Sequence, residues 1–456
     1  MEEILRMNNK KDVNQLLIIG NGFDLQCGLK SSFKNYFKYV KEKMDNQDKT
    51  LLNGNSISLE TVLPHSEFYL NYSSFWDCYF LSLELLEKNN DYGWCDVEKQ
   101  IEMFLTPGKN GSIGGIDADI LFNLLFLISL NELSNYNWND QLNKKIKRII
   151  ENENIEQSKK YIIGNIIKKL SYYISLSMEK SVQNSIKGNT NNLDSLISNY
   201  KSIFYSYLFI QLEKFEDNLN EYLQSLFQTK EPLILKNNEI SVTTHSEKVT
   251  KTLRNYMQRF SKLISKLTKD NKYNLLSFNY TYYSELIPAA HSSFLGTTSP
   301  ATRKICPNDC VIYKNIHGNL NDHIIIGIDE SGINEKDPLY KFTKTYRIMG
   351  LEDQEESCLS KSIKEITFYG HSLAKADYSY FQSIFDFYHI YDSDVKLIFY
   401  YSDYCNNREK CKFETVNRVI ELIKIYGNTL NNKDHGKNLL HKLKLENRLL
   451  IRELKN

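Results

Sequence analysis

The sequence is poor in the residues that bend a chain, since glycine and proline account for only 19 and 7 of its 456 residues. Proteins usually contain roughly 12% of the two together, so their usage here is about half of the ordinary level. This scarcity excludes collagen-like, linker-like and proline-rich disordered chains. It also disfavours an all-β fold, whose many turns consume both residues. Each remaining glycine is therefore informative about the backbone around it.

An excess of charge of one sign is also missing, because 57 Lys and Arg balance 56 Asp and Glu almost completely. Proteins that grip nucleic-acid backbones usually show a basic excess, so nucleic acid is not an expected partner. The longest apolar run, 120–130, falls well short of the roughly 20 residues that cross a bilayer, and we expect a buried helix there. With no membrane anchor or secretory leader in view, we expect a cytoplasmic protein with eight reduced cysteines.

Short apolar runs that end at polar or glycine-containing turns are typical of strands buried on both faces of a parallel sheet. Such runs lie at 15–19, 273–278, 311–316, 324–328, 366–369 and 395–401. Only the first of them precedes residue 270. The sheet is therefore expected to begin near the N-terminus and to be completed in the C-terminal half.

The chain from about 33 to 265 shows helical spacing instead. Within 200–226, four apolar residues recur on one helical face, namely Phe204, Leu208, Leu212 and Phe215. Segments with similar spacing lie at 75–87, 97–105, 140–151 and 161–178. The tail after 413 is also rich in helix formers, and 427–436 is expected to break it into two helices.

These patterns predict an α/β fold in which a Rossmann-like parallel sheet is interrupted by a large all-helical insertion and followed by a helical C-terminal tail. The expected boundaries are 13–60 and 266–412 for a discontinuous nucleotide-binding domain, 61–265 for the helical insertion, and 413–456 for the C-terminal helices. Ligands bind at the carboxyl ends of the strands in such a sheet. We therefore expect functional residues in the loops directly after the strands.

The loop that follows the first predicted strand contains three glycines, Gly20, Gly22 and Gly28. Glycines at this place let a phosphate approach the amides at a helix start, although an ordinary strand-to-helix turn has the same pattern. In the loop after 273–278, Asn279 is a candidate to hold a sugar hydroxyl or a water, and the alternative is a turn cap.

Two further loops follow predicted strands and carry polar side chains. His317 is a candidate general base, because imidazole titrates near neutrality; the alternative is a loop histidine that bonds a carbonyl. Gly370, His371 and Ser372 offer amides and a hydroxyl to a phosphate or ribose, and the alternative is a helix N-cap at Ser372. Together, the four loops are placed as a nucleotide site of an open α/β sheet would be.

Two of these loops lie in longer motifs that resemble those of a known family. The first motif is Leu17-Ile18-Ile19-Gly20-Asn21-Gly22-Phe23-Asp24-Leu25, and the second is Tyr369-Gly370-His371-Ser372-Leu373 with Asp377 and Tyr380-Phe381. They resemble the opening and closing motifs of the AbiH family of bacterial abortive-infection (anti-phage) proteins. Other stretches that fit are Trp94 with Glu98, Phe278-Asn279-Tyr280-Thr281, and His317-Gly318. The resemblance covers about 15 to 400 and implies an anti-phage effector.

The order of the motifs is also similar to that of sirtuin-like NAD-binding domains, although more distantly. This resemblance implies that NAD is a substrate, hydrolysed to nicotinamide and ADP-ribose. Asn279 would position the ribose or a water, and His317 would act as the base. The residues that would bind the cofactor are Gly20, Asn21, Gly22, Phe23, Asp24, Gly28, Gly370, His371, Ser372 and Asp377.

The sequence departs from the sirtuin-like pattern at several positions. Asp24 stands where sirtuins have a serine, and Thr281 replaces the acid that commonly follows Asn-Tyr. The four-cysteine zinc module is missing, since Cys306 and Cys310 are isolated and the later Cys405 and Cys411 make a poor second pair. We therefore expect no metal, and NAD hydrolysis is favoured over peptide deacetylation.

Two other functions remain open from the sequence. One is a nucleotide-binding defence switch without catalysis, which would signal through the helical domain. The other is a metal-dependent nuclease effector, for which Asp329, Glu330 and Asp377 are candidate ligands. Besides the nucleotide, the partners that such an effector implies are a phage-encoded trigger and further copies of itself in a homo-oligomer.

Overall fold

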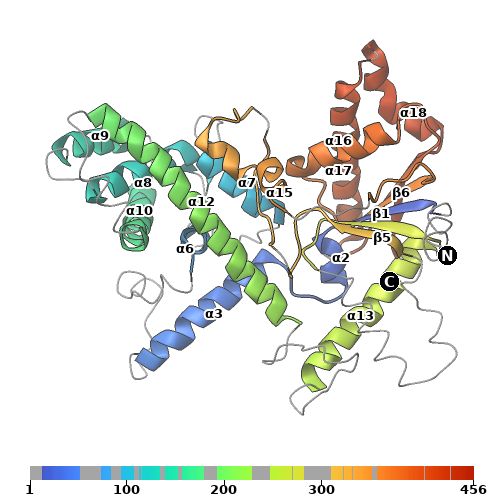
Figure 1. Ribbon diagram of the computed structural model, residues 1–456, viewed down its shortest axis with the longest axis horizontal. Helices are drawn as coiled ribbons and strands as arrows, with labels where there is room; N and C mark the ends of the chain where they lie inside the picture. The colour runs from blue at the N-terminus through green and yellow to red at the C-terminus, as the bar shows by residue number, and fades with distance from the viewer. Residues whose placement is uncertain are drawn as a thin grey trace. The chain divides into compact units, whose positions relative to one another are not determined.

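The computed structural model, drawn in Figure 1, describes most of the chain in separate ranges. These are residues 13–51, 73–83, 94–106, 112–113, 116–133, 139–152, 157–178, 193–227, 247–269, 271–281, 310–321, 323–330, 332–351, 357–404, 406–431 and 433–455. The chain forms two compact units. The sheet unit comprises Met1–Ser32, Leu223–Ile324 and Gly350–Asn456, and the helical unit comprises Phe33–Tyr222 and Ile325–Met349. The domain boundaries expected from the sequence stay predictions.

The sheet unit is built on six parallel strands in the order β5-β4-β1-β6-β7-β8. Their bounds are β1 Gln15–Ile19, β4 Tyr273–Ser277, β5 Cys310–Asn315, β6 Glu365–Tyr369, β7 Lys396–Tyr401 and β8 Leu449–Glu453. Five of the six predicted strands are therefore confirmed, and so is the parallel α/β sheet. β1 and β4 are buried at every position, as expected for strands covered on both faces.

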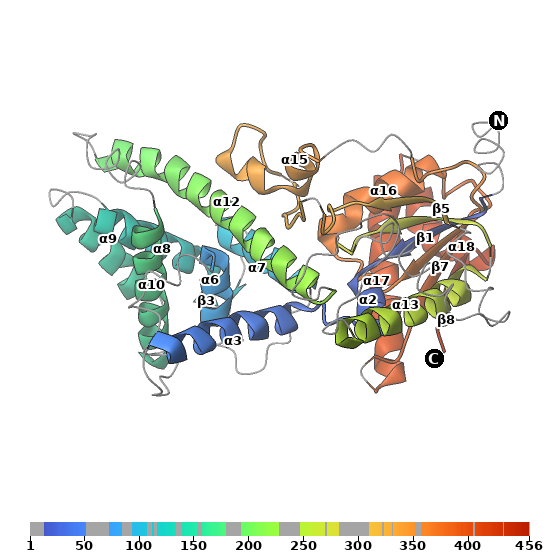
Figure 2. The same cartoon turned by 60° about the horizontal axis from the view of Figure 1, so that its bottom comes forward.

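Helices cover the two faces of this sheet. On one face, α13 (Glu247–Thr268) packs an apolar stripe that includes Tyr256 and Phe260 onto Leu17 of β1 and Leu275 of β4. On the other face, the rings of α16 (Tyr378–Phe387) pack against Phe368 of β6. Phe368 is in register with Ile18, the residue next to Leu17. Because successive residues of a strand point to opposite faces, Phe368 and Leu17 lie on opposite faces of the sheet. Figure 2 shows α13 and α16 on opposite sides of the strands.

The helical unit confirms the predicted helices. They are α6 Phe75–Leu83, α7 Trp94–Leu105, α8 Ala118–Leu133, α9 Asn139–Asn152, α10 Gln157–Ser177 and α12 Leu193–Ser225, preceded by α3 Phe33–Leu51. Two short strands, β2 (Ser112–Ile113) and β3 (Ile116–Asp117), pair in antiparallel orientation. The predicted face of α12 is fully buried at Phe204, Leu208, Leu212 and Phe215. Among the described residues, no helix has both the length and the apolar character to cross a membrane.

Helix α6 begins at a capping box. The amide of Asp77 donates to Ser74 Oγ at 3.0 Å, and the amide of Ser74 donates back to Asp77 Oδ2 at 2.8 Å. The fully buried carboxylate also accepts hydrogen bonds from Tyr36 Oη of α3 and Asn218 Nδ2 of α12. One acidic side chain thus joins three helices, and burial raises its pKa.

The predicted strand at 324–328 is wrong. Its isoleucines are buried, but within the described ranges its strand pairings are single bridges from Ile324 to Gly318 and from Ile328 to Thr343. The amide of Ile326 donates to Glu216 Oε1 rather than to a neighbouring strand. A run of apolar residues indicates that the segment is buried, but not that it pairs with a strand. Here side chains and loop carbonyls accept the hydrogen bonds of the backbone amides.

The segment that follows is held to the helical unit by two buried ion pairs. It contains η4 (Pro338–Phe342) and α15 (Lys344–Ile348). Lys344 Nζ lies 2.9 Å from Glu98 Oε2 of α7, and Arg347 Nη2 lies 2.6 Å from Glu216 Oε2 of α12. Glu98, which fits the AbiH-like pattern, thus has a structural contact.

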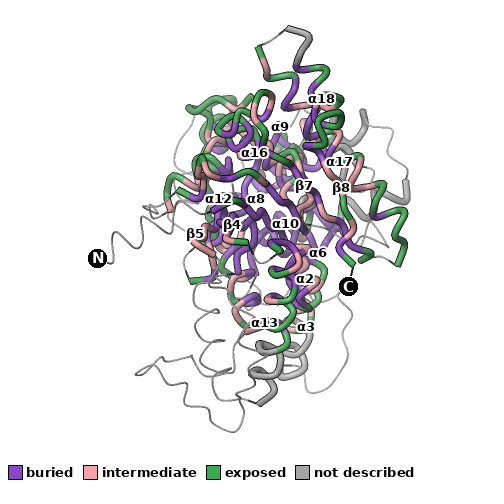
Figure 3. The backbone as a smooth tube through the Cα atoms, turned by 90° about the vertical axis from the view of Figure 1, so that its right-hand side faces the viewer, coloured by how far each residue is buried: buried purple, intermediate pink, exposed green. Residues whose placement is uncertain are grey.

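The expectation of a wholly helical tail is also wrong, because the tail ends in strand β8. The predicted break is present: α17 (Arg408–Thr429) is followed by η6 (Lys433–Asn438) and α18 (Leu439–Leu445). A Cβ on Gly427 would lie 2.3 Å from the carbonyl oxygen of Gly436, so the backbones meet where the chain turns back. In Figure 3 the backbone of β4 and β7 is largely buried, whereas α18 has both buried and exposed residues.

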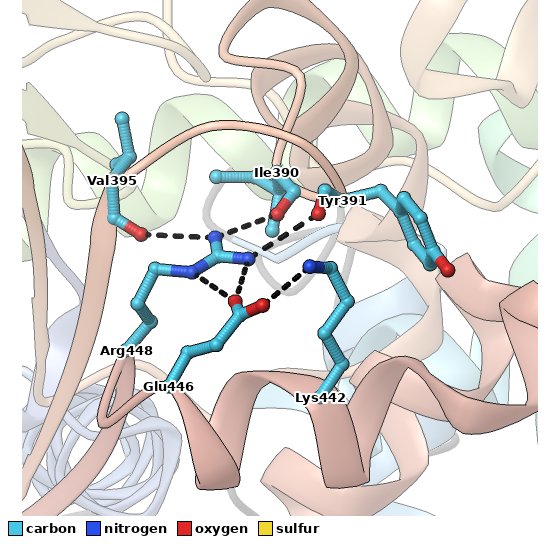
Figure 4. A network of polar contacts seen from close by, with 6 residues as sticks. All are labelled: Ile390, Tyr391, Val395, Lys442, Glu446 and Arg448. Carbon is cyan, nitrogen blue, oxygen red and sulfur yellow. Dashed lines mark hydrogen bonds and ion pairs between the residues drawn. The ribbon is translucent and has the colours of Figure 1, made fainter.

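The physical reason for β8 is a buried arginine at its start. Figure 4 shows the Arg448 guanidinium among the carbonyls of Ile390, Tyr391 and Val395, which precede β7. Its Nη1 donates to Ile390 O at 2.8 Å, and its Nε donates to Glu446 Oε2 at 2.7 Å. These contacts hold the chain beside the start of β7, where the apolar residues after Arg448 continue the sheet. In the sequence, the apolar run of β8 is hard to recognise because the residues before it have helical periodicity.

Candidate functional site at the carboxyl edge of the sheet

The four candidate loops leave one edge of the sheet. Ile19 is in register with Ser277 of β4 and Tyr369 of β6, and Ser277 is in register with Asn315 of β5. The ladder continues one residue further, since Phe278 N donates to Ile19 O at 2.9 Å and Gly20 N donates to Tyr369 O at 3.1 Å. Because all strands are parallel, the residues after them meet at this edge.

The centre of this edge is an acid between two histidines. Asp377 ends the short helix η5 (Lys375–Asp377) that follows the β6 loop. Its Oδ1 lies 3.6 Å from His317 Nε2, and its Oδ2 lies 3.4 Å from His371 Nε2. These separations exceed a hydrogen bond of about 2.9 Å, but they allow strong attraction when a ring is protonated. The three side chains are at most 8% exposed, so water screens these charges little.

Aromatic rings enclose this acid and its histidines. The ring centroid of Phe278, from the β4 loop, lies 4.4 Å from that of His371 and 5.4 Å from that of His317. Tyr380 of α16 lies 5.6 Å from His317, and Phe381 lies 5.1 Å from His371. The apolar walls lower the local dielectric and strengthen the electrostatic interactions inside.

A backbone amide fixes the tautomer of His371. Leu373 N donates to His371 Nδ1 at 2.8 Å, in a loop where Leu373 has a positive φ of 55°. A ring whose Nδ1 accepts a hydrogen bond carries its hydrogen on Nε2, and this assignment follows from the hydrogen bond. Nε2 then faces Asp377 as a donor and is unsuited to bind a metal. Within the described ranges, no group of three His, Cys, Asp or Glu residues is placed to hold a metal ion; Cys306 and Cys405 lie outside these ranges.

The backbone around Asn279 is held by residues of β5. Asn315 Nδ2 donates to the carbonyls of Asn279, at 2.5 Å, and Thr281, at 3.2 Å. Tyr313 Oη donates to Thr281 O at 3.0 Å and also contacts Asn315 Oδ1. Asn279 itself is 4% exposed. Tyr313 and Asn315 were not among the residues predicted from the sequence, although their spacing of two residues on a strand places them on one face.

Asp24 ties the first loop to its neighbours. Its carboxylate is 1% exposed and accepts hydrogen bonds from Tyr256 Oη of α13 and Thr281 Oγ1, both at 2.6 Å. Thr281, which replaces the acid of the sirtuin-like pattern, is therefore a donor to a carboxylate. This carboxylate thus holds the β1 loop, the β4 loop and α13 together.

A comparison with protein-family models matches residues 16–211 and 198–401 to a family described as "Bacteriophage abortive infection AbiH". The chain belongs to the AbiH family. The predicted family is thereby confirmed, and its description suggests a role in defence against phage by abortive infection. The search of curated proteins found no match, and neither did the search of solved structures. The sirtuin-like resemblance stays a prediction.

In this AbiH chain the two glycine motifs pack against each other. A Cβ on Gly22 would lie 2.8 Å from Gly370 Cα, and a Cβ on Gly370 would lie 2.2 Å from Phe23 N. The amide of Gly22 donates to Gly370 O, and that of Phe23 donates to Gly20 O, both at 2.8 Å. The opening and closing motifs thus require glycine because two backbones touch, and three loop amides, including that of Gly20, already donate to carbonyls within the protein.

Other predicted cofactor-binding residues also have local contacts. Asn21 contacts Ser31 through both atoms of its side-chain amide. Gly28 adopts a positive φ of 90° just after α2 (Asn21–Gln26). The cofactor contacts of all the predicted residues, including Ser372, stay predictions. For the nuclease hypothesis, Asp329 and Glu330 belong to the helical unit and Asp377 to the sheet unit.

Proposed function

We propose that this AbiH chain is an abortive-infection effector that binds NAD at the carboxyl edge of the sheet and hydrolyses it to nicotinamide and ADP-ribose. The observation that carries the proposal is the buried His317–Asp377–His371 cluster beside the loop of Asn279. Perturbed or paired titratable groups enclosed by apolar walls are typical of catalytic sites.

The strand order supports a nucleotide as the ligand. Numbered along the chain, the six strands are arranged 3-2-1-4-5-6, because β4 and β5 lie on one side of β1 and β6 to β8 on the other. This is the order of doubly wound sheets that bind dinucleotides, and they bind them where the chain reverses direction across the sheet. Here that place is the carboxyl end of β1, between the loops of Asn279 and Gly370.

The proposed reaction needs little from the protein beyond positioning and a base. The bond between ribose C1′ and the nicotinamide nitrogen breaks, and its electron pair neutralises the positive nitrogen. A water oxygen then bonds to C1′, and His317 accepts the proton that the water loses. Asn279 would hold the ribose or this water in place. The predicted glycine-loop residues would contact the diphosphate through groups other than the three engaged amides.

The proposal is tested by incubating the purified full-length chain with NAD, with and without an extract of phage-infected cells as trigger, and quantifying nicotinamide. Removing an acid–base group typically costs 10²–10⁴-fold in rate, so we expect a loss of about that size in His317→Gln and Asn279→Ala. Exposed residues of the sheet unit provide matched controls, His441→Asn and Asp394→Asn. Absence of nicotinamide release under both conditions, or full release by both site variants, would overturn the proposal.

One observation favours a nucleotide-binding switch as the second candidate. Asn279 and His317 are each only 4% exposed, so a substrate reaches them only when the surrounding loops move. A switch would bind NAD without consuming it, and its ligand-induced rise in melting temperature would persist in His317→Gln. Measurement of binding and turnover on the same sample separates the two functions.

A further inference from the structure

We infer that Asp377 and His371 are positioning residues that fix the tautomer and orientation of His317. The inference rests on the proposed function in one respect, that His317 is the base. From the sequence, His371 and Asp377 were predicted to contact the cofactor. In the structure, Asp377 instead lies between the two histidines, with one carboxylate oxygen near His371 and the other near His317.

The first step is that His371 acts as a fixed donor. Its Nδ1 is occupied by the amide of Leu373, so its Nε2 carries the hydrogen that faces Asp377 Oδ2. Phe278 and Phe381 pack around the ring at centroid distances of 4.4 and 5.1 Å and limit its rotation. A neutral His371 in this state has no nitrogen that accepts a proton without breaking the contact with Leu373.

The second step concerns the other oxygen of the carboxylate. Asp377 Oδ1 faces Nε2 of His317, which favours the tautomer with the hydrogen on Nε2. Nδ1, on the opposite side of the ring, is then the basic nitrogen. When Nδ1 takes a proton, the positive ring lies beside an acid that His371 holds in place from the other side. This is the logic by which a buried acid orients a catalytic histidine.

Asp377 of η5 and Tyr380 of α16 lie against His317, and His371 of the β6 loop lies at the other oxygen of Asp377. Asp24 of α2 lies beside the β4 loop, where the hydroxyls of Thr281 and Tyr256 hold its carboxylate. Of these groups, Asp377 is an acid within ion-pair distance of the His317 ring. Its replacement should therefore alter the titration of His317.

Three isosteric or near-isosteric substitutions test the arrangement. Asp377→Asn keeps the shape but places an amide donor against one imidazole, so it should shift His317 to the other tautomer. The expected result is a fall in kcat of about 10²–10⁴-fold, with KM changed less than threefold and the acidic limb of the pH–rate profile displaced. His371→Phe should lower kcat in the same manner, whereas His371→Gln, which retains a donor near Nε2, should recover most of it.

Nuclear magnetic resonance provides a readout that does not depend on NAD cleavage. In the full-length chain with ¹⁵N-labelled histidines, the structure predicts Nε2–H tautomers for His371 and His317 and a changed His317 titration in Asp377→Asn. Nδ1–H at His371, or a His317 titration that Asp377→Asn leaves unchanged, would overturn the inference. If Asp377→Asn does not fold, as judged by circular dichroism, equal activity of folded His371→Phe and His371→Gln overturns it. Failure of the wild-type chain to release nicotinamide would refute the proposed function. The measured tautomers of His371 and His317 would still test this inference.

Discussion

Replacing Gly370 by alanine should destabilise the sheet unit in two ways, through the positive φ of this residue and through a clash of the new Cβ with a neighbouring backbone. Two other glycines of this chain serve as controls for these effects. Gly370 has a φ of 71°, and a Cβ there would lie 2.2 Å from Phe23 N. Gly332 has a similar φ of 79°, but a Cβ there would meet no atom within 4 Å, and Gly164 has neither feature. The positive φ costs an alanine about 1–2 kcal/mol, and forced overpacking adds about 1–3 kcal/mol.

We therefore expect Gly370→Ala to cost about 2–5 kcal/mol and Gly332→Ala about 1–2 kcal/mol. Gly164→Ala lies in helix α10 and should stabilise by up to about 1 kcal/mol. Hydrogen–deuterium exchange measures these values locally, in β1 and β6 for Gly370 and in the neighbouring helices for the two controls. Trp76 of α6 and Trp94 of α7 belong to the helical unit, so tryptophan fluorescence checks that this unit stays folded in Gly370→Ala. A cost at Gly370 no greater than at Gly332 would refute the backbone contact between the two motifs.

Three further predictions follow from buried polar groups. Arg448→Ala should destabilise β8 by about 2–4 kcal/mol, because two buried carbonyls and one partly buried carbonyl lose a charged donor. Exchange of the β8 amides measures this, and equal protection in wild type and variant would contradict it. Asp24→Asn and Tyr256→Phe should show a coupling energy of about 1–2 kcal/mol in a double-mutant cycle of urea unfolding, and strictly additive losses would exclude their hydrogen bond. Burial raises the pKa of Asp77 above 3.8, so the folded state keeps a proton that the unfolded chain releases. The stability from Asp77 is then fully present below pH 3.8 and is lost as the pH rises through the folded-state pKa. Wild type should lose stability relative to Asp77→Asn as the pH rises above about 4, as followed by tryptophan fluorescence, and the opposite trend would contradict a raised pKa.

The sequence predicted the parts of the fold that depend on local patterns. Short apolar runs stopped by glycine or polar turns identified β1, β4, β5, β6 and β7, and the stripe of α12 identified its buried face. β8 was missed because its place depends on Arg448, whose backbone carbonyl partners lie more than 50 residues earlier. The run at 324–328 was assigned wrongly because burial alone does not reveal whether a neighbouring strand supplies the hydrogen bonds.

The candidate site was predictable to a similar degree. Placement after parallel strands identified the loops of Asn279 and His317, because the carboxyl ends of such strands share an edge. The link from Asp377 to both histidines was not predictable, since it depends on how η5 folds back after β6. The glycines were expected to make room for a phosphate. Their three-dimensional surroundings show that at Gly20, Gly22 and Gly370 they make room for another backbone.

The central claim, that this AbiH chain defends cells by cleaving NAD at the His317 cluster, is tested most directly by measuring NAD in infected cells before lysis. Cells that express the wild-type chain or the exposed control His441→Asn should lose NAD, accumulate nicotinamide and restrict phage. Cells that express His317→Gln should keep NAD at the uninfected level and lose protection, at equal amounts of protein. Protection with undiminished NAD, or equal NAD loss in His317→Gln, would contradict the account.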